Sequence, residues 1–143
     1  LRGLDSLTEA TVVTIGAPAE WYWNPVGTPD GNPLLRDLDG LGSLRSASLG
    51  IYGNTGLETL RGLDAFRAAA NILIAHNAVL SDVSSLEGLV IGGEDGSVTV
   101  HDNPCLPNEA AQRVVDTRDP SAPIREPRIE NNGLGECPSS ADQ

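Results

Sequence analysis

The chain has 143 residues, the length of one ordinary domain, and its 9 Lys+Arg against 20 Asp+Glu give a net charge of −11. This acidic balance argues against nucleic acid and anionic membrane surfaces as partners, because phosphate groups are bound by clustered Lys and Arg. Hydrophobic residues make up 39% of the chain, enough for a core, and no apolar run approaches the ~20 residues of a membrane span.

A repeated pattern, apolar-x-apolar-x-x-Asn-x-x-Leu, organises most of the chain. It occurs at residues 49–57, 72–80 and 98–106, and an interrupted copy runs from residue 13 to residue 35. The apolar residues that follow each copy recur in steps of three, as in Leu57, Leu60, Leu63 and Phe66. Because Leu1 already follows this spacing, we expect the chain to be part of a longer protein.

Each copy predicts a short strand, a corner at the Asn and an irregular arc whose leucines face inward. One unit cannot bury its own apolar stripe, whereas stacked units can, with parallel strands ~4.8 Å apart. We therefore predict a mainly β fold, a right-handed parallel β-helix or solenoid of about four to five leucine-rich rungs with a short C-terminal α-helical cap. An Asn at each corner can bond backbone groups that the bend leaves unpaired. We interpret four asparagines as structural in this way: Asn32, Asn54, Asn77 and Asn103.

An insertion at residues 17–31 interrupts the first copy of the repeat. It contains Trp21, Tyr22 and Trp23, and these include both tryptophans of the chain. Insertions in repeat proteins carry binding loops, and Trp and Tyr are favoured at binding hot spots. We interpret these three aromatic residues as candidate ligand contacts. The alternative is that the loop folds back and its rings cover part of the solenoid wall.

The strand residues expected on the outer face of the sheet form a small, mostly uncharged strip. They are Thr14, Gly16, Gly50, Tyr52, Leu73, Ala75, Thr99 and His101. In so acidic a chain an uncharged face is a candidate contact surface, with Tyr52, Leu73 and His101 as ligand-binding residues. The alternative is that these residues only favour a flat sheet. None of them is acidic, which argues against an enzyme that cleaves polysaccharides with grouped carboxylates.

The two histidines, His76 and His101, are expected about one repeat unit apart, with Asp102 beside His101. Such a group can serve as a weak metal site or in acid–base chemistry. The favoured interpretation is two exposed polar side chains. We therefore assign no metal, no cofactor and no catalytic residue to the chain.

The C-terminal segment, residues 107–137, is predicted to cap the last repeat. Residues 107–116 predict a short helix with an apolar stripe, and residues 129–133 resemble one last degenerate unit. Cys105 and Cys137 are the only cysteines, and a disulfide between them would tie this cap to the final turn; the alternative is two free buried thiols. A disulfide implies an oxidising, extracytoplasmic setting. Residues 138–143 are expected to be a disordered tail.

The repeat spacing, with GLETLRGLDAF at residues 56–66 and HDNPCL at residues 101–106, resembles the receptor L-domain family. These are the single-stranded β-helix lobes in the ligand-binding parts of insulin-type and epidermal-growth-factor-type receptors. The resemblance covers residues 1–106 and implies the same fold and a role in ligand recognition. The chain departs from the family in the insertion at residues 17–31 and in lacking the first turns of a full lobe. A bacterial surface protein built from such repeats fits the acidic composition, in which every cation is Arg.

The sequence thus predicts a single L-domain-like unit at residues 1–137, located at the cell surface or secreted. Its expected function is non-enzymatic recognition or adhesion through binding of a protein or a glycan. The first alternative is a purely structural spacer or stalk in a larger surface protein. A polysaccharide-acting β-helix enzyme is a third and less favoured alternative.

Overall fold

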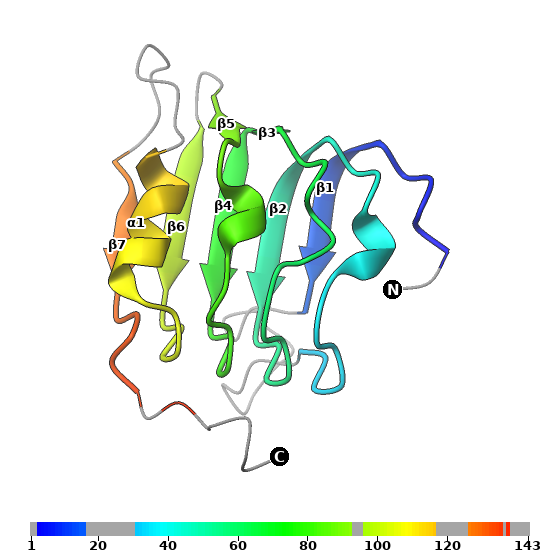
Figure 1. Ribbon diagram of the computed structural model, residues 1–143. Helices are drawn as coiled ribbons and strands as arrows, with labels where there is room; N and C mark the ends of the chain where they lie inside the picture. The colour runs from blue at the N-terminus through cyan, green and yellow to red at the C-terminus, as the bar shows by residue number, and fades with distance from the viewer. Residues whose placement is uncertain (1–2, 17–30, 93–95, 117–125, 136, 138–143) are drawn as a thin grey trace, which may run out of the picture.

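The computed structural model describes residues 3–16, 31–92, 96–116, 126–135 and 137 (Figure 1). These residues form a sheet of seven strands, two short 3₁₀ turns and one α-helix. The strands are β1 (Glu9–Ile15), β2 (Ser46–Tyr52), β3 (Ala68–Ala69), β4 (Asn71–Ala75), β5 (Val90–Ile91), β6 (Ser97–His101) and β7 (Arg128–Glu130). The 3₁₀ turns are η1 (Asp39–Leu41) and η2 (Ser84–Leu86), and the helix is α1 (Asn108–Asp116).

All the strand pairs of the sheet are parallel, and their register follows the repeat. Ile51 in β2 pairs with Ile74 in β4, which pairs with Val100 in β6. β1 joins β2 through Ile15, and β7 joins β6 through Ile129. The described chain is thus an α/β arrangement of a largely parallel sheet and one helix, and the predicted parallel strands and C-terminal helix are confirmed.

The core lies between the sheet and the segments that connect its strands, with η2 and α1 in front of the sheet in the view of Figure 1. Ile51, Ile74 and Val100 on the inner face of the sheet have no exposed surface. Apolar residues spaced by three in the connecting segments face them because each step of three returns to the same side of the segment. The buried members of these triplets are Leu38, Leu41, Leu44, Leu57, Leu60, Leu63, Phe66, Leu80, Val83, Leu86 and Leu89.

A column of asparagines runs along the corner that follows the strands. Its members are Asn32, Asn54, Asn77, Asn103 and Asn132. The side-chain oxygen of each of the last four accepts hydrogen bonds from the backbone N–H and the side-chain amide of the Asn before it. The side-chain amides of the same four also donate to carbonyls of Ile15, Ile51, Ile74 and Val100.

The structure places all four predicted corner asparagines in this column, although Asn32 is exposed at its end. Asn54, Asn77 and Asn103 are completely buried. Asn132, 1% exposed, is a fifth member that the sequence analysis did not assign. The column satisfies the polar groups of a buried corner, which would otherwise destabilise the fold.

Helix α1 covers the C-terminal end of the core with Ala111, Val114 and Val115, as its apolar stripe predicts. Among the described residues, no helix has the length and apolarity needed to cross a bilayer.

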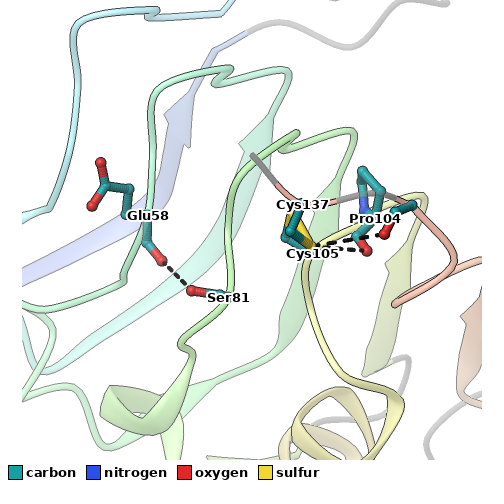
Figure 2. The surroundings of a disulfide bond; sticks show 6 residues. Glu58, Ser81, Pro104, Cys105 and Cys137 are labelled. Atoms are coloured by element: carbon teal, nitrogen blue, oxygen red, sulfur yellow. Dashed lines mark hydrogen bonds between the residues drawn. A yellow bond between two sulfur atoms is a disulfide. The ribbon is translucent and has the colours of Figure 1, made fainter. Parts of the chain in front are cut away.

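The predicted disulfide between Cys105 and Cys137 is confirmed (Figure 2). The two Cα atoms are 5.2 Å apart, and the bond closes a sequence separation of 32 residues. Cys105 lies in the buried turn after β6, beside Pro104, while Cys137 follows β7. The bond therefore holds the last strand and the last Asn of the column against the preceding repeat unit.

Candidate functional site

The outer face of the sheet carries a row of four residues from four neighbouring strands. Thr14 pairs with Gly50, Gly50 pairs with Leu73, and Leu73 pairs with Thr99. Because side chains two positions apart along a strand point to the same face, the next outward row contains Tyr52, Ala75 and His101. The structure thus brings the predicted contact residues Tyr52, Leu73 and His101 onto neighbouring rows of one face. We call this face, from Thr14 to His101, the outer strip.

The Tyr52 side chain bends back along β2 and lies over Gly50. A Cβ atom added at Gly50 would lie 2.7 Å from Cε2 and 2.8 Å from Oη of Tyr52. Gly16, at the end of β1, has a φ of +88°, and a side chain there would meet the carbonyl oxygen of Tyr52. The two glycines therefore make the space in which the Tyr52 ring and backbone fit, rather than forming contact positions of their own.

A shallow hollow of about 240 Å³ lies on the outer strip, across β1, β2, β4 and β6. Its lining contains no charged side chain. Tyr52, Leu73 and the 61% exposed Val12 provide the bulk, while hydroxyl and amide groups surround them. Ser97 donates a hydrogen bond of 2.9 Å to the side-chain oxygen of Asn71, which fixes two of these groups. The polar lining residues are Thr14, Ser48, Asn71, Ser97 and Thr99.

The structure adds two details to the predicted strip. Ala75 lies in the outward row between Tyr52 and His101 but is only 2% exposed, so it offers little surface for contact. The strip also gains charged neighbours beyond His101 and Thr99. Strand β7 adds Arg128 beside Thr99 and Glu130 beside His101, and these two charges form an ion pair of 2.8 Å.

Arg128 and Glu130 were not predicted from the sequence, because the degenerate last unit was given no outer positions. Aligning Asn132 with the asparagines of the other units would have placed both residues on the outer face. The guanidinium of Arg128 holds the pKa of the Glu130 carboxyl below its ordinary value, chiefly by a hydrogen bond. Glu130 is thus a charged carboxylate held in an ion pair with Arg128. The uncharged part of the strip ends at Thr99.

His76, His101 and Asp102 form a cluster at the C-terminal ends of β4 and β6. The imidazole rings are 5.2 Å apart between centroids and stand at 85° to each other. Asp102 Oδ2 lies 2.6 Å from His101 Nδ1 and 3.9 Å from His76 Nε2. The expected proximity of the two histidines is therefore present, and Asp102 lies between them.

The charge of Asp102 is favoured by its hydrogen-bond partners. His101 lowers the pKa of this carboxyl most, and a hydrogen bond of 3.0 Å from Asn131 to Oδ1 lowers it further. Asp102 is therefore a carboxylate at neutral pH. Among the residues that the structure describes, these are the three His, Cys, Asp or Glu side chains grouped closely enough to hold a metal ion.

A larger hollow, about 540 Å³, lies where the strands begin. It is lined by small side chains, among them Ala10, Ala47, Ala68 and Ala69, and lacks an aromatic residue. Because rigid aromatic side chains are the usual anchors of binding sites, the outer strip is the better candidate. The other predicted contacts, Trp21, Tyr22 and Trp23, lie outside the described residues and stay a prediction.

Comparisons with protein-family models, with curated proteins and with solved structures found no match.

Proposed function

We propose that this chain is a non-enzymatic recognition module that binds a glycan or a protein ligand on the outer strip of its sheet. The observation that carries the proposal is the neutral hollow around Tyr52 and Leu73 in a chain with a net charge of −11. Charged side chains bind water strongly over most of such a surface, so covering them with a ligand is unfavourable. Removing water from a neutral patch requires much less free energy. The hollow is therefore a surface that a ligand can cover with a small desolvation free energy.

The chemistry of the hollow favours a neutral glycan over a protein. One aromatic ring surrounded by hydroxyl and amide groups matches a sugar, which has apolar ring faces and many hydroxyl groups. The hollow is shallow and its described lining has a single aromatic side chain, whereas protein interfaces usually bury several large anchors.

We further propose that the chain winds as a right-handed β-helix of the receptor L-domain kind. The parallel register from β1 to β7 and the hydrogen-bonded Asn column support a repeated turn of the chain. The disulfide supports the proposed location at the cell surface or outside the cell, because such bonds persist in oxidising compartments.

The proposal is tested on an array of neutral oligosaccharides probed with the purified chain. Tyr52→Ala and Leu73→Ala remove two of the bulky groups of the hollow. Each is expected to weaken binding of a captured glycan at least about tenfold, as loss of a hot-spot side chain does. Leu134→Ala is the matched control because Leu134 is 75% exposed and takes no part in the hollow.

Equal binding by wild type, Tyr52→Ala and Leu73→Ala would show that the outer strip is not the site. Tryptophan fluorescence then reports on the insertion at residues 17–31, since both tryptophans lie there. A chain that captures no glycan and no protein ligand would instead support the structural spacer alternative.

A further inference from the structure

The fold brings His76 and Asp102 to equivalent places in neighbouring repeat units. Each directly precedes an Asn of the buried column, Asn77 or Asn103, and each has a left-handed backbone, with φ of +57° for His76 and +54° for Asp102. The backbone N–H of His76 donates to the carbonyl of His101 at 3.4 Å. The backbone that carries these side chains is therefore held in place by the buried Asn column, as a preformed binding site requires.

The spacing of the three side chains matches what one metal ion needs. Bonds of 2.0–2.1 Å in a tetrahedral site put ligand atoms about 3.4 Å apart. The distances from Asp102 Oδ2, 2.6 Å to His101 Nδ1 and 3.9 Å to His76 Nε2, bracket this value. One ligand atom from each residue lies within 4.8 Å of the others. The Asp102 side chain is about one-third exposed, so it has room to adjust toward equal distances when an ion binds.

The donor set selects the class of ion. Two imidazole nitrogens and one carboxylate oxygen suit Zn²⁺ and its neighbours among the divalent transition metals, whereas Ca²⁺ and Mg²⁺ prefer oxygen ligands only. Three protein ligands leave a coordination position for water or a ligand. We propose that His76, His101 and Asp102 bind one divalent transition-metal ion, with Zn²⁺ as the best match. This site lies at the His101 end of the outer strip and is distinct from the hollow around Tyr52 and Leu73, whose lining includes none of the three residues.

The neighbours of the cluster orient its carboxylate and leave both histidines partly open to solvent. Asn131 donates to Oδ1 of Asp102 and leaves Oδ2 turned toward the histidines. A second hydrogen bond of this kind orients a metal-binding carboxylate and supports its charge. The His101 side chain is 14% exposed and the His76 side chain 33% exposed, so an ion can enter from solvent without any opening of the fold. When Zn²⁺ is bound through Nδ1 of His101, the neutral imidazole carries its one ring proton on Nε2.

The test is isothermal titration calorimetry of the chelator-treated chain with ZnCl₂. The chain carries no oligohistidine tag and no thiol reductant is present, because both bind zinc and a reductant would open the Cys105–Cys137 disulfide. We expect saturable binding of one ion, and no comparable binding of CaCl₂ or MgCl₂. His76→Asn and Asp102→Asn should each weaken Zn²⁺ binding at least about tenfold.

These variants are chosen to keep the fold. Asn adopts a left-handed backbone readily, and Asn131 occupies the equivalent position of the last unit with a φ of +54°. Asn at position 102 keeps the oxygen that accepts from Asn131. Glu58→Gln is the matched control, since it removes one exposed carboxylate that pairs with Arg36 and does not belong to the cluster, and it should bind Zn²⁺ as the wild type does.

A second measurement needs no variant. The chain has only two histidines, so the imidazole signals in a nitrogen-15 NMR spectrum come from His76 and His101 alone. Both should shift together as Zn²⁺ is added, to an end point at one equivalent. The proposal is overturned if neither signal responds, if only one does, or if His76→Asn and Asp102→Asn bind Zn²⁺ as tightly as Glu58→Gln.

Discussion

Asn77 occupies the middle of the asparagine column and is completely buried. Its side-chain oxygen accepts from the backbone N–H and the side-chain amide of Asn54, and its own amide donates to Ile51, Ala75 and Asn103. Truncation to Ala therefore leaves two donors of Asn54 without this partner inside the fold. At about 1–3 kcal/mol for each buried group left unpaired, Asn77→Ala should lower the free energy of unfolding by roughly 2–5 kcal/mol in urea titrations.

Asn32→Ala is the control for this prediction. Asn32 stands at the exposed end of the column, and its backbone N–H still donates to Asn54 when its side chain is removed. The loss should be about 1 kcal/mol or less. Equal losses for Asn77→Ala and Asn32→Ala would mean that burial within the column adds nothing to its stability.

The corner asparagines could be predicted because one residue type recurs at one place in the repeat. Asn132 was harder to find, since 29 residues separate it from Asn103, against 22, 23 and 26 for the earlier steps. The burial of Ala75 could not be predicted for a different reason. A strand pattern gives the direction of a side chain but not how far its surroundings cover it, and Ala75 lies in the outward row yet is only 2% exposed.

At the scale of elements, Asp82 holds the start of η2 against the neighbouring repeat unit. Its carboxylate accepts from the backbone N–H of Ser84 at 2.9 Å and from the hydroxyl of Thr59 at 3.2 Å. The hydrogen bonds from Ser84, followed by that from Thr59, lower the pKa of Asp82 below 3.8 despite partial desolvation. The charged form is therefore the one that stabilises this turn.

The sign of the pH dependence follows from this shift. Because the pKa of Asp82 is lower in the folded chain than in the unfolded chain, its contribution is fully present above pH 3.8 and is lost as the pH falls through the folded-state pKa. Asp82→Asn should lower stability at pH 7 by about 1 kcal/mol or less, since the site is exposed. The variant should also lose less stability than the wild type between pH 5 and about 2.

Urea titrations at several pH values measure both effects. Glu9→Gln makes the same change of charge at an exposed position away from this turn, and it should keep the acid dependence of the wild type. Parallel pH profiles for the wild type and Asp82→Asn would contradict the assignment of this carboxylate to the acid response.

The order of elements was largely predictable, because strand, corner and leucine arc recur with one period. The proximity of the two histidines was predictable in the same way, because they are 25 positions apart, about one repeat unit. The distance of 3.9 Å between Asp102 Oδ2 and His76 Nε2 was not predictable, because it depends on the register of β4 and β6 and on the left-handed corners that follow them. The hollow on the outer strip also depends on the Tyr52 ring lying over Gly50, a rotamer choice that spacing alone does not reveal.

At the scale of the whole molecule, arginine side chains link neighbouring repeat units. Arg36 pairs with Glu58 at 2.7 Å, and Arg61 pairs with Asp37 and Asp39 at 3.1 and 2.9 Å. These pairs are exposed, and exposed pairs contribute about 0–1 kcal/mol each. In a chain of charge −11 they offset part of the repulsion between acidic residues, but the buried leucines and the Asn column hold the units together.

The disulfide extends this cohesion to the last unit, whose strand β7 has only three residues. Replacing both cysteines with Ala removes a link across 32 positions, and the chain-entropy model gives a loss of about 3–4 kcal/mol in the free energy of unfolding. Urea titration measures this loss. We also expect the last unit to open first. Without the disulfide, the few contacts of its short strand alone must offset the entropy lost when that loop is closed.

Hydrogen exchange separates local opening from global unfolding. The backbone N–H of Asp102 donates to Glu130, and that of Asn103 donates to Asn132, so both amides report on the last unit. In the double Cys→Ala variant these two amides should lose more protection from exchange than the amide of Asn54. That amide donates to Asn77, which is two units away from Asn132 in the column. If all three amides lose the same protection, the chain unfolds as one cooperative unit, and the disulfide stabilises the whole molecule rather than its C-terminal end.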